Sequence, residues 1–80
     1  MLSMAGPATK LRQLRDELGV TQEAISRKTR SIGLRTYIRA ESGSRVTYDT
    51  ATQILEAVNS ILEETGKSKV TLDDLGLTLY

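Results

Sequence analysis

Residues 21–43 contain two short helical patterns joined by a turn, and this pair constrains the fold more than any other feature of the chain. Thr21 is placed to cap the first helix of this pair, because a threonine hydroxyl accepts a hydrogen bond from a free amide at the start of a helix. We expect the second helix to run over residues 34–42. Arg35 and Arg39 lie four positions apart and would therefore share one face of that helix.

Three further helices are predicted around this pair. Leucines at helical spacing predict a first helix from near Ala8 to Leu18. An apolar stripe predicts a long helix between a cap at Thr47 and a stop before Gly66. A short last helix would begin after a third threonine cap at Thr71.

These elements predict a single all-α domain, a compact bundle of about five short helices. It spans residues 1–80, with its core over about residues 8–76. We expect residues 1–7 to be flexible. Residues 75–80 alternate apolar with small or polar side chains, a pattern typical of extended chain, and form a candidate dimerisation arm.

Composition argues against catalytic and metal chemistry. The chain has no cysteine and no histidine, so it lacks thiolate chemistry and the commonest general base and metal ligand. We therefore expect no enzyme activity, no metal and no cofactor. No apolar run approaches the roughly 20 residues that span a bilayer, and residues 1–10 lack a signal-peptide pattern. The sequence predicts a cytoplasmic protein without a membrane partner.

Charge is distributed unevenly along the chain. Residues 27–45 carry six cations against Glu41 alone, a net charge of +5. Residues 46–80 carry two cations and six carboxylates, a net charge of −4. Such a polarity would orient the protein towards a polyanion, and the alternative is a solvated basic face.

Three motifs resemble, in their order and spacing, the Cro and repressor family of phage helix-turn-helix proteins (the Cro/C1-type or XRE family). They are LRQLR at residues 11–15, GVTQE at 19–23 and RAESG at 39–43. The resemblance covers about residues 10–76 and implies a lambda repressor-like DNA-binding domain. The chain departs from the family pattern in one place. One extra residue lies between Gln22 and Glu41, in the first helix of the pair or in the turn.

The resemblance implies that the chain binds double-stranded DNA and that helix 34–42 enters the major groove. The predicted DNA-binding residues are Gln22, Leu34, Arg35, Thr36, Ile38, Arg39, Ser44, Arg45 and Thr47. An arginine can bond guanine O6 and N7 together, so Arg35 and Arg39 would read bases or clamp phosphates. Ile38 would meet a thymine methyl group or pack at the edge of the core. Arg45 would bond a phosphate near the start of the next helix.

Other residues have structural or long-range roles by the same resemblance. Arg15 and Glu41 form a partly buried salt bridge that ties the first helix to the pair. Gln22 bonds a phosphate and also steadies side chains of helix 34–42. We expect three cations on the first helix of the pair to act mainly through the electrostatic field, or one of them to reach the DNA backbone: Arg27, Lys28 and Arg30.

The sequence thus predicts a transcriptional regulator, a dimeric repressor on a palindromic operator, which would be nucleoid-associated when bound. The alternative is an antitoxin-type or adaptor protein that uses the same fold mainly for protein–protein interaction. Apolar residues late in the chain support a homodimer: Ile61, Leu62, Leu72, Leu75, Leu77, Leu79 and Tyr80. They would form a twofold interface, because so small a monomer cannot easily bury them, or the tail would fold back to complete the core.

Overall fold

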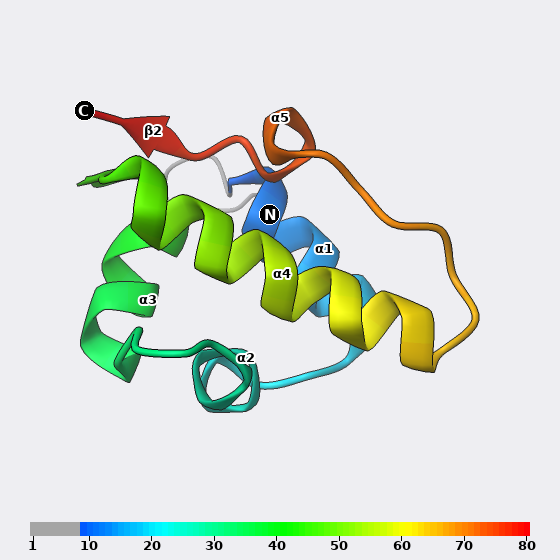
Figure 1. Cartoon of the computed structure of the whole chain (residues 1–80). Coiled ribbons are helices and arrows are strands. Elements are labelled where there is room, and N and C mark those ends of the chain that lie inside the picture. Colours follow the sequence, from blue (N-terminus) through cyan, green and yellow to red (C-terminus); the bar gives the residue numbers. More distant parts are fainter. Residues whose placement is uncertain (1–8) are drawn as a thin grey trace, which may run out of the picture.

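The structure is a computed structural model that describes residues 9–80 (Figure 1). The elements follow the chain as α1 (Lys10–Leu18), α2 (Gln22–Lys28), α3 (Leu34–Glu41), β1 (Arg45–Val46), α4 (Tyr48–Glu64), α5 (Leu72–Leu75) and β2 (Thr78–Leu79). Helices dominate this part of the chain, which confirms the predicted all-α fold class. The two short strands were not predicted. The flexibility predicted for residues 1–7 lies outside the described residues. Along residues 9–80 no helix is both long and apolar enough to span a lipid bilayer.

Threonine side chains begin three of the helices. Thr9, Thr21 and Thr47 each accept a backbone N–H from three residues further on, at 3.0 or 3.1 Å. Each bond satisfies an amide that has no partner within its helix. The caps at Thr21 and Thr47 are predicted ones, and the third predicted cap, Thr71, is the N-cap of α5. The first helix begins at Lys10 rather than near Ala8, because Thr9 is extended and acts as its cap.

The core forms where α4 packs across the other helices (Figure 1). Its buried apolar residues are Leu11, Ile25, Tyr37, Ala40, Val46, Ala51, Ile54, Ala57, Val58, Ile61, Leu62 and Leu75. Ile25, Tyr37 and Ala40 are fully buried. Along α4 the buried side chains recur at helical spacing, so the apolar stripe of the sequence becomes the buried face of the helix.

The turn between α2 and α3 lies between Gln22 and Glu41, the stretch in which the chain exceeds the family spacing. Residues 29–33 lie outside both helices, and Thr29 already has extended backbone angles. Gln53 of α4 is buried, and its side-chain oxygen accepts the N–H of Ser31 at 2.9 Å. The turn is therefore fastened to α4. Arg30 lies in this turn, not on the preceding helix.

The tail folds back along its own chain. β2 runs parallel to β1, and Arg45 lies opposite Thr78. The register continues with Val46 opposite Leu79, and the N–H of Tyr80 donates to the Val46 carbonyl oxygen at 3.1 Å. Figure 1 shows β2 beside the segment that enters α4. The extended conformation predicted for residues 75–80 is confirmed for Thr78–Leu79, which pair within the chain, whereas Leu75 ends α5 and Gly76 caps it.

Most of the apolar residues late in the chain are buried within the monomer. The core and its edge hold Ile61, Leu62, Leu72, Leu75 and Leu77. Leu79 and Tyr80 remain exposed. The premise that so small a monomer cannot easily bury all of these side chains holds only for Leu79 and Tyr80, because α4, α5 and the returning tail cover the other five.

Candidate nucleic-acid interface

α3 has one buried face and one exposed face. Tyr37 and Ala40 are fully buried, and with about 3.6 residues per turn the opposite side of the helix must point outward. That side carries Leu34, Arg35, Thr36, Ile38 and Arg39, all exposed. The structure therefore gathers these predicted DNA-binding residues on one surface, which we call the α3 face.

Leu34 and Ile38 give the α3 face an apolar component. Each of the two residues is 40% exposed, so neither is absorbed into the core. They lie one helical turn apart on the same side of α3. Both remain accessible for an apolar contact such as that with a thymine methyl group.

The arginines of the α3 face and of β1 are not neutralised within the chain. Arg35, Arg39 and Arg45 are exposed, and none of them takes part in an ion pair among residues 9–80. A guanidinium without an internal partner can bond a base edge or a phosphate without first breaking another contact.

Three cations of α2 and the following turn are neutralised, in contrast to these arginines. The pairs are Arg27 with Glu23 at 2.8 Å, Lys28 with Glu64 at 2.8 Å and Arg30 with Glu56 at 2.9 Å. Exposed pairs of this kind add little stability but cancel much of each other's field. These ion pairs therefore weaken the field that the three cations can supply, and the cations of residues 27–45 without an ion pair in the described chain lie on α3 and β1.

Glu41 connects α1, α2 and α3 at the end of the α3 helix. Glu41 is 4% exposed. Its carboxylate accepts hydrogen bonds from Arg15 Nε at 2.7 Å and from Arg15 Nη2 at 3.1 Å. The Tyr37 hydroxyl and the Gln22 amide donate to the same carboxylate, each at 2.8 Å. The predicted salt bridge between Arg15 and Glu41 is confirmed. Gln22 steadies a side chain of α3 as predicted, and its phosphate contact stays a prediction.

These contacts shift the pKa values of the groups involved. Burial alone would raise the pKa of Glu41, but the hydrogen bonds from Arg15, Tyr37 and Gln22 outweigh it and hold this pKa below its ordinary value. The pKa of Tyr37 lies well above its ordinary value, because the hydroxyl is buried and bonded to the carboxylate. The hydrogen bond to Glu41 also raises the pKa of Arg15.

The shifts predict that stability falls at both ends of the pH scale. Unfolded Glu41 binds a proton near its ordinary pKa of 4.5, which the folded chain resists, so the free energy of unfolding falls as the pH drops below 4.5. Unfolded Tyr37 loses its proton near pH 10.0, which the folded chain retains, so stability also falls above pH 10.0. Urea unfolding at a series of pH values measures both effects. Tyr37→Phe should reduce the alkaline fall, and an unchanged fall would contradict this assignment.

The segment after α3 places further predicted residues beside the α3 face. Arg45 is exposed on β1, whereas Ser44 is half-buried and its N–H donates to the Arg39 carbonyl at 3.0 Å. The Thr47 hydroxyl accepts the N–H of Thr50 and donates to the Thr50 hydroxyl, both at 3.1 Å. A DNA contact by the Thr47 hydroxyl would therefore compete with its role as the cap of α4.

Two surface hollows lie beside the α3 face. The first, of about 350 Å³, is lined by Arg12, Arg15, Gln22, Ile38, Glu41 and Ser42. The second, of about 230 Å³, is lined by residues that include Thr36, Arg39, Arg45, Thr47, Thr50 and Tyr80. A helix seated in a major groove likewise has a phosphate backbone on each side. Over residues 9–80 there is no cluster of three or more His, Cys, Asp or Glu side chains that could hold a metal ion.

Sequence reasoning missed Arg12 and Tyr80 as parts of this surface. Arg12 is exposed and lines the first hollow, and its place one position after the core residue Leu11 could have indicated an outward direction. No local pattern places Tyr80 near Arg39. Only the pairing of β2 with β1 brings it to the second hollow.

Comparison with known proteins identifies the family. A family model described as helix-turn-helix matches residues 11–62, more than half of the chain. No curated protein and no solved structure matches the chain significantly. The matched range contains α2, the turn and α3, together with α1 from Leu11 and most of α4. The resemblance seen in the three motifs is thus confirmed, and the chain belongs to the Cro/C1-type (XRE) family of DNA-binding helix-turn-helix regulators.

Proposed function

We propose that the chain is a sequence-specific transcriptional repressor that acts as a homodimer on a palindromic operator. The α3 face carries this proposal, because Arg35 and Arg39 are exposed on it and engaged in no ion pair of the described chain. α3 would lie in the major groove. A dimer would present its two copies of α3 to half-sites about 34–36 Å apart, one turn of B-DNA.

Each residue of the α3 face offers chemistry for one kind of DNA contact. Arg35 lines neither hollow and presents its planar fork to guanine O6 and N7. Arg39 lines the second hollow and bonds a base edge or a phosphate. Leu34 and Ile38 contact thymine methyl groups, and Thr36 bonds a phosphate.

Residues on either side of α3 would hold the two phosphate backbones. Gln22 lies at the first hollow and Arg45 and Thr47 at the second. Ser44 joins them in the segment between α3 and α4. Such contacts position the protein on the duplex and carry no sequence information of their own.

Selection of bound duplexes from a random pool tests the proposed function. The enriched sequences should form a palindrome whose half-sites are one or more helical turns apart. A pool that yields no enriched sequence, although the protein is folded, would contradict sequence-specific recognition. An enriched site without twofold symmetry would contradict the dimer.

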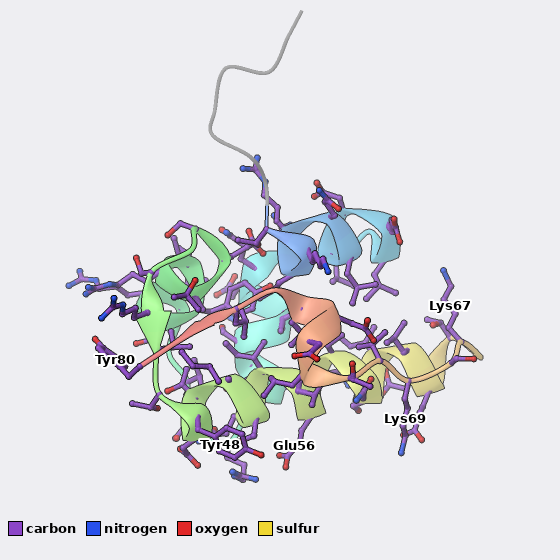
Figure 2. The ribbon with its side chains drawn as sticks, turned by 90° about the horizontal axis from the view of Figure 1, so that it is seen from above. Tyr48, Glu56, Lys67, Lys69 and Tyr80 are labelled. Carbon is purple, nitrogen blue, oxygen red and sulfur yellow. The ribbon has the colours of Figure 1, made fainter. Side chains whose placement is uncertain are left out.

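Arg45→Ala should weaken binding mainly through the electrostatic term. Loss of one phosphate contact should reduce the slope of log K against log salt by about one, with similar effects on all sequences. Affinity measured over a salt series gives this slope. Lys67→Ala is the matched control, because Figure 2 shows Lys67 at the opposite end of the molecule from Tyr80, and its slope should equal that of the wild type. A wild-type slope for Arg45→Ala would remove Arg45 from the interface.

The dimer is tested by the number of chains on one operator. Sedimentation of the protein with the selected duplex should give two chains per duplex. The interface suggested by the sequence, built from the end of α4, α5 and the tail, now has few exposed apolar residues to offer, chiefly Leu79 and Tyr80. A single chain per duplex would contradict dimeric binding but not the proposal that α3 contacts the bases.

A protein partner is the second candidate function. The exposed Leu34 and Ile38 favour it, because apolar side chains on an outward face also suit a protein surface. An antitoxin-type or adaptor protein would use the α3 face in this way. Binding to DNA that responds little to salt, together with no selected sequence, would favour this function over gene control.

A further inference from the structure

The end of the chain lies beside the DNA-facing surface, although it is remote from the helix-turn-helix in sequence. The N–H of Tyr80 donates to the carbonyl oxygen of Val46 at 3.1 Å, which continues the pairing of β2 with β1. Parallel pairing thus holds Tyr80 next to the strand that carries Arg45 (Figure 1). Backbone bonds fix this position, and it does not depend on the tyrosine ring.

Tyr80 is almost free of packing and lines the second hollow. The residue is 83% exposed, so its ring contributes little to the core. It shares the hollow with Arg39 and Arg45, and none of the described residues that line this hollow has an acidic side chain. Figure 2 shows Tyr80 at the end of the molecule away from Lys67 and Lys69. A concave surface with guanidinium and hydroxyl donors suits an anion with several acceptor oxygens.

We propose that Tyr80 is a further DNA-binding residue, whose hydroxyl donates to a backbone phosphate oxygen held in the second hollow by Arg39 and Arg45. The inference rests on the proposed function, because it requires α3 to lie in the major groove. Tyrosine hydroxyls are among the groups that bond phosphates in protein–DNA complexes. An uncharged donor releases no counterion, so this contact strengthens binding without changing its salt dependence.

Tyr80→Phe separates this contact from those of the arginines. Loss of the hydroxyl should weaken binding about three- to tenfold at every salt concentration, with an unchanged salt slope. The same factor should apply to a duplex of unrelated sequence, because phosphates carry no sequence information. Thermal unfolding of the free protein should not change, since the residue is exposed. Tyr48→Phe is the matched control, because Tyr48 is 68% exposed and does not line the hollow, and it should bind as the wild type does.

Two results would overturn the inference and leave the proposed function intact. One is wild-type affinity for Tyr80→Phe while Arg39→Ala loses affinity. The other is an equal loss for Tyr80→Phe and Tyr48→Phe. A wild-type protein that binds no duplex at all would instead overturn the proposed function, and the inference with it.

Discussion

Replacement of Glu41 by alanine is expected to lower the free energy of unfolding by about 3–5 kcal/mol. The carboxylate accepts from Arg15, Tyr37 and Gln22, so its removal leaves a partly buried cation and a buried hydroxyl without a partner. Urea unfolding followed by circular dichroism measures the change. Affinity for DNA should fall as the folded fraction falls, because Glu41 acts on the position of α3 and does not reach the α3 face.

Glu17→Ala is the matched control for this substitution. Glu17 is also a glutamate on a helix, but it is exposed and takes part in no ion pair among residues 9–80. Its loss should change the free energy of unfolding by no more than about 0.5 kcal/mol. If Glu41→Ala destabilised the fold as little as Glu17→Ala does, the hydrogen bonds of Glu41 to three helices would not contribute to stability as proposed.

Arg35→Ala and Arg39→Ala should each cost about 1–3 kcal/mol of binding free energy on the selected duplex, roughly 5- to 150-fold in affinity. Each exposed guanidinium would lose its contact with a guanine edge or a phosphate, and nothing within the chain would compensate. A variant that loses a guanine contact should also accept other bases at one position of the half-site. Both variants should unfold as the wild type does, because these side chains lie outside the core.

Arg27→Ala provides the control for net charge. Arg27 is the same residue type, but it lies on α2 and pairs with Glu23 at 2.8 Å. Removing it should change affinity by no more than about twofold, because an exposed and neutralised charge is largely screened. A loss as large as that of Arg39→Ala would show that total charge, and not the α3 face, determines binding.

The helices of this chain could be predicted because their signals are local. Thr21 and Thr47 cap helices as predicted, since a cap needs only the amides that follow it. Ile25 and Tyr37 are buried because helical spacing already places them on the inner faces. The salt bridge between Arg15 and Glu41 came from the family resemblance, which supplied a contact that spacing alone does not give.

The remaining contacts join residues far apart in the chain, and local patterns do not record them. β1 pairs with β2 across more than 30 positions, Arg45 opposite Thr78. Lys28 of α2 forms an ion pair with Glu64 of α4. The net charge of residues 27–45 therefore overstates the number of cations that are free to contact DNA, because the fold brings carboxylates close to several of them. The same long-range pairing hid the position of Tyr80.

Guanine recognition by the α3 face is tested most directly by replacing the guanines of the selected duplex with 7-deazaguanine, which removes the N7 acceptor from the major groove. The wild-type protein should bind the substituted duplex more weakly. A variant that no longer prefers guanine at one position, Arg35→Ala or Arg39→Ala, should bind a duplex substituted at that position alone as well as it binds the unsubstituted duplex. Equal affinity of the wild-type protein for both duplexes would contradict guanine recognition by the α3 face.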